Sequence, residues 1–250
     1  MPLPSPTTIH TTVWHADTVV HSVDVEGDTG RRLVPDALLP DWLCTVVRRL
    51  DGAPLPAWVL HATDPPPPDA RRGAVLMLLA EGDDGPDLVI TQRAATLRAH
   101  AGQPAFPGGA LEAGEDDVAA ALREAAEETA LDPAGVTPVA TLPQLYLPPS
   151  RFAVRPVLAH WDTPCDIRAV DPAETQRVLR VPVTDLADPD SRGTVVLKAG
   201  GPRGLVRTLR SPAFRVGGLT VWGFTAGLVD LLLEWGGWAV PWDRTREMTP

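Results

Sequence analysis

Acidic residues gather in one short segment of this chain, at positions where they could bind a cation. Residues 112–128 hold seven carboxylates and a single base, Arg123. Carboxylates in the last turns of a helix oppose its macrodipole and repel one another, and Glu124, Glu127 and Glu128 stand in that unfavourable place. An acidic helix is ordinarily a solvated face. Three carboxylates at this end, however, provide the charge and oxygen ligands that a hard cation needs, so we predict a Mg²⁺ or Mn²⁺ site.

The pattern of residues 116–129 predicts the helix that would carry these acids. At about 100° per residue, Val118, Leu122 and Ala125 form one stripe, which should face the core, and the acids fall on a separate arc. Ala120 shares the acid arc one turn earlier. We therefore expect no bulky side chain beside the carboxylates.

A pair of glycines precedes this helix in the tetrapeptide 106–109, Phe-Pro-Gly-Gly. Glycines allow a sharp turn and a close approach of the backbone to a ligand. A carbonyl of this turn could be a further metal ligand. A simple tight turn before a helix explains the same residues equally well.

These positions together resemble the Nudix box. That box is a glycine, five residues, a glutamate, seven residues, and then Arg-Glu-apolar-any-Glu-Glu-any-Gly-apolar. Here it begins at Gly109, continues at Glu115 and ends in the run 123–131. Every charged position matches, and the one departure is Ala130, where the family has glycine. The site lies just past the helix and favours a left-handed backbone, where alanine would cost roughly 1 kcal/mol.

Further segments resemble the coenzyme A pyrophosphatase branch of the Nudix hydrolases, namely residues 90–93, 97–109, 148–156 and 221–226. The resemblance covers about residues 70–240. It implies an α/β fold, a Nudix-type α/β/α sandwich with a mixed sheet and the box as loop–helix–loop. It also implies a Mg²⁺- or Mn²⁺-dependent hydrolase that cuts coenzyme A, with its thioesters as candidate substrates, into 3′,5′-ADP and 4′-phosphopantetheine.

The resemblance also assigns roles to single residues. The implied metal ligands are the three helix glutamates and a backbone carbonyl, that is Glu124, Glu127, Glu128 and Gly109. Arg123 would orient the acids and pair with Glu115.

The general base is less determined than the metal ligands. Glu127 or Glu128 could combine that task with metal binding. Many members of the family place a base on a later loop, and Glu174 is the candidate here. An acid that follows Pro172 by two residues also suits the first turn of a helix, which is the alternative interpretation.

A substrate with several phosphates needs donors, and an acidic chain must supply them locally. Arg93 and Arg98 precede the box, and a guanidinium can hold phosphate with two parallel hydrogen bonds. Either could instead be a surface residue. His100 is a further candidate for substrate binding or a hydrogen-bonding residue of the loop. Gln103 could bind an amide of the pantetheine arm or fix the loop.

The elements expected to position these residues fall into three parts. Residues 1–33 are expected to be a flexible extension, with a strand near 11–25 as the alternative. Residues 34–69 contain a short helix at 40–50 and a proline-rich link, and residues 70–250 form the Nudix domain with a C-terminal helix and tail. Strands are expected at 73–79, 87–91, 137–142, 154–160, 180–183, around 194–215 and at 220–222, and helices at 116–129 and 225–235.

Composition limits the possible classes of protein. The chain has 250 residues, 44% of them hydrophobic, and a net charge of −10, which argues against nucleic-acid binding. No apolar run is long enough for a membrane span and no secretory signal is expected, so the cytoplasm is the expected location. The late tryptophans would pack the last helix, or form a subunit interface in a homodimer.

Two other functions remain open. The first is a Nudix hydrolase of another nucleoside diphosphate derivative, such as ADP-ribose or a dinucleotide. The second is a module that senses a nucleotide without cutting it. Such modules tend to lose box carboxylates, and all are present here.

Overall fold

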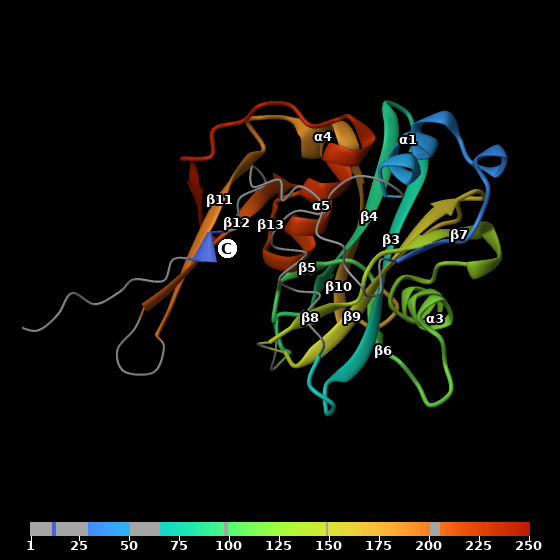
Figure 1. Ribbon diagram of the computed structural model, residues 1–250, viewed down its shortest axis with the longest axis horizontal. Coiled ribbons are helices and arrows are strands. Elements are labelled where there is room, and N and C mark those ends of the chain that lie inside the picture. Colours follow the sequence, from blue (N-terminus) through green and yellow to red (C-terminus); the bar gives the residue numbers. More distant parts are fainter. Residues whose placement is uncertain (1–11, 14–29, 51–65, 98–99, 149, 201–205) are drawn as a thin grey trace, which may run out of the picture.

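The chain folds around a mixed β-sheet that carries helices on both faces (Figure 1). The computed structural model describes residues 12–13, 30–50, 66–97, 100–148, 150–200 and 206–250. Within these ranges the strands form a larger and a smaller sheet. The prediction of an α/β sandwich with a mixed sheet is confirmed, and the smaller sheet is an addition to it.

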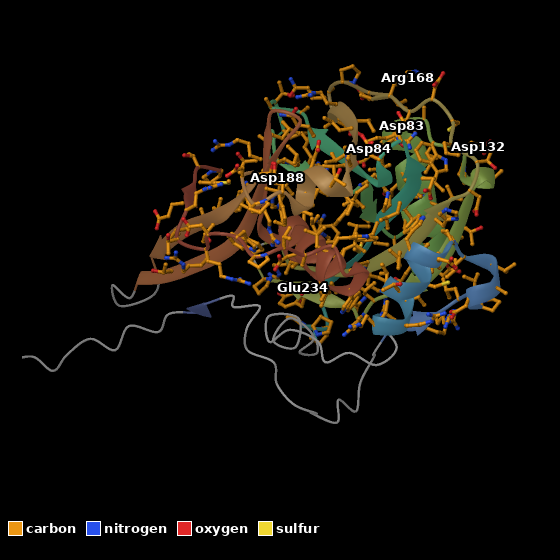
Figure 2. All side chains as sticks on the ribbon, turned by 90° about the horizontal axis from the view of Figure 1, so that it is seen from above. Asp83, Asp84, Asp132, Arg168, Asp188 and Glu234 are labelled. Carbon is orange, nitrogen blue, oxygen red and sulfur yellow. The ribbon has the colours of Figure 1, made fainter. Side chains whose placement is uncertain are left out.

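The larger sheet has the strand order β10-β4-β3-β9-β7-β2, with the short strands β5, β6 and β8 attached to β4, β3 and β9. Only β3 and β9 run parallel among its described pairs. The turn between β3 and β4 contains Asp83 and Asp84 (Figure 2). The strands are β2 (Arg31–Arg32), β3 (Arg71–Gly82), β4 (Gly85–Arg93), β5 (Pro104–Ala105), β6 (Gly108–Ala110), β7 (Val136–Thr141), β8 (Leu145–Leu147), β9 (Phe152–Trp161) and β10 (Thr175–Pro182).

The smaller sheet is built on a long hairpin of β11 and β12, which extends away from the rest of the chain in Figure 1. β13 pairs with the end of β12, and two-residue strands add to the outer edges. The members are β1 (Thr12–Val13), β11 (Arg192–Gly200), β12 (Val206–Val216), β13 (Leu219–Trp222) and β14 (Glu247–Met248).

Each face of the larger sheet packs against different helices. The helices are α1 (Asp41–Leu50), α3 (Asp117–Thr129), α4 (Val183–Ala187) and α5 (Gly223–Gly236), with short 3-10 turns at Asp36–Leu38 and Pro133–Gly135. α3 covers one face, over a core that includes Leu76, Leu78 and Val89. α1 and α5 cover the other face, over Leu79 and Ile90. Successive strand residues point to opposite faces, so one buried strand serves both cores.

Part of the N-terminal segment 1–33 joins the larger sheet. β2 lies within the segment expected to be a flexible extension, and it pairs with β7 at Arg31–Thr141 and Arg32–Ala140. The remainder of that segment, residues 1–11 and 14–29, and residues 51–65 of the expected link lie outside the described residues. Among the helices that the structure places, none is long and apolar enough to cross a bilayer.

Candidate functional site

α3 is fixed to the sheet by its first residues. The Asp116 side chain accepts a hydrogen bond from the Ala119 amide at 2.8 Å, which caps the helix. Asp117 forms ion pairs with Arg72 of β3 at 2.8 Å and with Arg155 of β9 at 3.3 Å. These ion pairs are not predictable from the sequence alone, since an acid in the first turn of a helix is their only local signal. The two ion pairs hold the acidic helix over two central strands.

Small residues let α3 lie close to the sheet. Ala121 and Ala125 are fully buried, and Val118 and Leu122 pack partly buried beside them, which confirms the expected apolar stripe. Ala120, on the arc of the acids, is fully buried as well, so the helix also lies close to its neighbours at that position.

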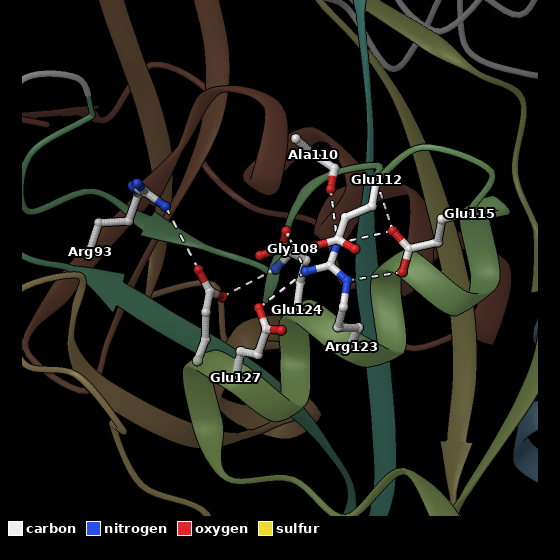
Figure 3. Close-up of polar contacts among 9 residues, drawn as sticks. Arg93, Gly108, Ala110, Glu112, Glu115, Arg123, Glu124 and Glu127 are labelled. Carbon is white, nitrogen blue, oxygen red and sulfur yellow. Dashed lines mark hydrogen bonds and ion pairs between the residues drawn. The ribbon is translucent and has the colours of Figure 1, made fainter.

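Arg123 organises the carboxylates around it (Figure 3). Its Nε and Nη2 donate to the two oxygens of Glu115 at 2.9 and 3.0 Å, so the expected pair is present as a two-pronged contact. Nη1 donates to Glu124 and to Glu127, each at 3.1 Å. Nη2 also donates to the Ala110 carbonyl at 3.0 Å. One guanidinium thus ties the glycine turn to the helix.

The paired glycines are required by close contacts. A Cβ on Gly109 would lie 2.4 Å from the Glu124 carboxyl carbon, so only glycine leaves room for that carboxylate. Gly108 has φ of +155°, and a Cβ there would lie 2.3 Å from the Ala74 carbonyl oxygen. A side chain would therefore clash at either position. The turn brings its backbone directly against the acidic helix.

Glu128 is the most enclosed of the three helix glutamates. Its side chain is 11% exposed, whereas those of Glu124 and Glu127 are 19% and 60% exposed. One carboxylate oxygen accepts a hydrogen bond from the Gly108 amide at 3.2 Å. The other lies 3.8 Å from Nη1 of Arg93, which reaches in from β4.

Burial and neighbouring charges act against each other on these acids. Burial raises the pKa of Glu128 to about 7, although the Gly108 amide and Arg93 oppose this. Burial also raises the pKa of Glu124, and Arg123 partly offsets it. Hydrogen bonding from Arg123 lowers the pKa of Glu115. The neighbouring donors therefore offset the effect of burial on Glu124 and Glu128 only in part, and a bound cation would stabilise their charged forms.

Arginines are the cationic partners of the acids on α3. In the described part of the chain, no three His, Cys, Asp or Glu side chains already converge on one point. Arg123 bridges Glu124 and Glu127 instead, and Glu128 turns to Gly108 and Arg93. The donor set is all oxygen, one carboxylate fills a space that only glycine provides, and two acids have raised pKa values. These residues fit a hard divalent cation.

Glu174 lies in a turn and not in a helix, so the helix-start interpretation is wrong. Its amide donates to the Asp171 carbonyl at 3.0 Å, and its carbonyl accepts from the Ala94 amide at 2.8 Å. The side chain is exposed and close enough to contribute to the raised pKa of Glu128. The structure thus brings Glu174 to the rim of the carboxylate group.

The loop before the box is held by its own residues. His100 Nδ1 and Gln103 Oε1 lie 2.8 Å apart, and His100 has φ of 55°. The Gln103 carbonyl accepts from the Arg93 amide at 3.1 Å. Gln103 therefore fixes the loop, one of the two roles considered for it. Arg98 lies outside the described residues.

The sequence of the chain matches that of a known protein family. A family model described as the NUDIX domain matches residues 70–198, just over half of the chain. The chain belongs to the Nudix family. The predicted resemblance to the Nudix family is thereby confirmed.

The chain is similar to several named Nudix proteins. It is 35% identical over 165 residues to Nudix hydrolase 22, chloroplastic, of Arabidopsis thaliana, which covers 64% of this chain and 53% of that protein. It is 34% identical over 173 residues to the uncharacterized Nudix hydrolase NudL of Citrobacter koseri, covering 66% and 84%. Among solved structures, the Nudix hydrolase RenU of M. Smegmatis aligns with 23% identity and a TM-score of 0.41, over 48% of this chain and 74% of that one.

The one departure from the Nudix box has the expected geometry. Ala130 follows α3 with φ of 58° and ψ of 24°, in the left-handed region, and its amide donates to the Ala126 carbonyl at 3.0 Å. The prediction of a left-handed residue here is confirmed. Alanine closes the helix as glycine does in the family, at a steric cost.

Proposed function

We propose that this Nudix chain hydrolyses the pyrophosphate linkage of a nucleoside diphosphate derivative, with Mg²⁺ or Mn²⁺, and that coenzyme A is its substrate. The single observation that carries the hydrolytic part is the cluster of α3 carboxylates, which lies against the Gly108–Gly109 turn and contacts Arg93 and Arg123. The choice of coenzyme A rests on the resemblance of the segment 93–106.

The proposed ligands of the cation are the three helix acids and one backbone oxygen, namely Glu124, Glu127, Glu128 and the carbonyl of Gly109. When bound, a divalent ion supplies charge neutralisation of phosphate oxygens and lowers the pKa of a water molecule. Arg123, which holds Glu124 and Glu127 through one nitrogen, keeps both acids on the same side of the helix. Glu115 fixes Arg123 in turn.

The carboxylates at the rim provide places for the proton of the attacking water. Glu174 is exposed and neighbours Glu128, so it can accept a proton and release it to solvent. Glu127, at 60% exposed, can do the same from the helix. Arg93 borders the acids on the opposite side from Arg123 and offers its guanidinium to a phosphate group (Figure 3).

Incubation of the purified chain with coenzyme A, ADP-ribose and NADH tests the proposal, with Mg²⁺ or Mn²⁺ and chromatographic detection of products. We expect coenzyme A to yield 3′,5′-ADP and 4′-phosphopantetheine. Turnover of ADP-ribose far faster than coenzyme A would contradict the substrate, and binding without turnover of any of them would favour a sensing module.

A matched pair of variants tests the site. Glu128→Gln should lower kcat by about 10² or more while the fold stays intact, because loss of a charged metal ligand should cost at least the 10- to 100-fold that groups orienting a ligand contribute. Glu234→Gln makes the same change at an exposed residue of α5 and should leave kcat unchanged. Equal activity in the two variants would remove Glu128 from the site.

A further inference from the structure

Two buried polar atoms where β4 and β10 meet have no hydrogen-bond partner among the described residues. One is Nε of Arg93, and the other is the hydroxyl oxygen of Thr175. Thr175 is 1% exposed, so water does not satisfy it from bulk solvent. Buried polar groups are nearly always paired, and an unpaired one costs roughly 1–3 kcal/mol. Two such atoms next to a candidate active site need an explanation.

These two residues are direct partners across neighbouring strands. Thr175, the first residue of β10, pairs with Arg93, the last residue of β4. Directly opposed residues lie on one face of a sheet, with Cβ atoms about 4.5–5.5 Å apart. The face is that of α3, because Arg93 reaches Glu128 there. The two unpaired groups therefore share one small region of the molecule.

A β-bulge creates this pairing. The register shifts between Thr175 and Arg177, so Gln176 has no partner on β4. With a regular ladder, Gln176 would oppose Arg93 instead. Bulges often occur next to active sites, where they redirect a side chain. The Thr175 amide donates to the Asp171 carbonyl at 2.8 Å, which fixes the start of the strand in this position.

The two groups are complementary. The Nε–H of arginine is a donor, and a threonine hydroxyl accepts as readily as it donates. The guanidinium is instead attracted to the Glu128 carboxylate. One oxygen of that carboxylate lies 3.8 Å from Nη1, which is too long for a hydrogen bond. Arg93 is thus held by charge in a position where its Nε is unsatisfied.

We propose that Thr175 is a positioning residue for Arg93. With a cation held by Glu128, the Nε of Arg93 would donate to the Thr175 hydroxyl, and its terminal nitrogens would face a phosphate oxygen of the substrate. The inference rests on the proposed function for the cation and the phosphate. Thr175 lies outside the Nudix box, so the resemblance to the box assigns it no role.

The first test separates stability from affinity with an isosteric variant. Thr175→Val removes an unpaired hydroxyl, so the melting temperature of the metal-free chain should stay the same or rise. With Mg²⁺, the KM for coenzyme A and the dissociation constant for inorganic pyrophosphate should rise roughly ten- to a hundredfold, the worth of one hydrogen bond to a charged group. Thr175→Ser keeps the hydroxyl and should restore both values, with kcat little changed throughout.

A double-variant comparison ties the effect to Nε. Arg93→Lys has no Nε, so Thr175→Val should weaken pyrophosphate binding no further in that background. A full additional loss there would overturn the inference, because Thr175 would then act on something other than Arg93. An unchanged dissociation constant in Thr175→Val alone would overturn it as well.

A spectroscopic test is independent of turnover. The Nε–H resonance of Arg93, assigned by its loss in Arg93→Lys, should become protected from solvent exchange on addition of Mg²⁺ and inorganic pyrophosphate, and should stay unprotected in Thr175→Val. An unprotected resonance in the wild-type chain overturns the inference even where coenzyme A is hydrolysed. A protected resonance without hydrolysis of any nucleotide overturns the proposed function and leaves the inference standing.

Discussion

At the scale of single residues, the three helix glutamates differ in the exposed fraction of their side chains. Glu127 is 60% exposed and Glu128 only 11%. An enclosed carboxylate with a raised pKa is costly to ionise, and that cost is the free energy a bound cation can recover. Glu128 therefore links the stability of the metal-free chain to its proposed chemistry.

This link gives a prediction for the pH dependence of stability without metal. The pKa of Glu128 is about 7 in the folded chain and 4.5 as a model value, so the folded state holds the proton more tightly. Its contribution to the free energy of unfolding is complete below pH 4.5 and is lost as pH rises through 7, by about 3 kcal/mol in total. Denaturant unfolding in the presence of a chelator should show this decline, and Glu128→Gln should flatten it.

Charged groups near Glu128 also affect the pH dependence of stability. Arg93, Glu124 and Glu174 all act on Glu128, and the pKa of Glu124 is also raised, which adds a decline of the same sign. Glu124→Gln is therefore the second variant to measure. A decline that is identical in the wild type and in Glu128→Gln would show that Glu128 is not the titrating group.

Arg123 supports a prediction on metal affinity. Lysine keeps the charge but cannot make the two-pronged contact with Glu115 while also bridging Glu124 and Glu127. Because groups that orient metal ligands typically contribute 10- to 100-fold, Arg123→Lys should weaken Mg²⁺ binding by about that factor in calorimetry. The matched change Arg177→Lys, at an arginine that donates to Gly217, should not. Equal Mg²⁺ affinity in the two variants would argue against an orienting role.

At the scale of elements, the end of α3 carries a steric cost that glycine would remove. Ala130 holds φ of 58°, where an L-residue is strained by roughly 1 kcal/mol or more. Ala130→Gly should therefore raise the free energy of unfolding by about 1 kcal/mol, partly offset by the greater freedom of glycine in the unfolded chain. The melting temperature should rise by about 2–4 °C. A lower melting temperature would mean that the Cβ makes a compensating contact.

The secondary-structure elements also show how much of the fold can be predicted from the sequence. The long strands and α3 and α5 were predicted, because period and apolar runs are local signals. The short strands β5, β6 and β8 were not, since each is stabilised by pairing with β4, β3 or β9 more than by its own residues. The Arg123–Glu115 pair was implied by the resemblance to the Nudix box. The Arg93–Glu128 contact and the bulge before Arg177 depend on strand register, which the sequence alone does not determine.

At the scale of the whole molecule, the smaller sheet is joined to the Nudix core through α5. This helix packs on α1 and β12 and is buried on almost every side. Arg192 of β11 and Asp230 of α5 form a buried ion pair at that junction. The Arg192 guanidinium carbon lies 5.0 Å from the Phe214 ring and 4.6 Å from the Trp242 ring. The C-terminal tail thus covers a charge that links the two sheets.

The last prediction concerns this ion pair. Burial lowers the pKa of Arg192, with Asp230 opposing it, so loss of Asp230 leaves a buried charge without its main partner. Asp230→Ala should reduce the free energy of unfolding by about 3–5 kcal/mol, whereas Asp83→Ala, at an exposed position in the turn between β3 and β4, should stay within about 0.5 kcal/mol. The double change Arg192→Met with Asp230→Leu should recover much of the loss, because it removes both charges. Since α3 lies on the opposite face of the larger sheet, kcat measured below the unfolding transition should not change in any of these variants. A fall in kcat without a fall in stability would instead show that the junction contributes to the site itself.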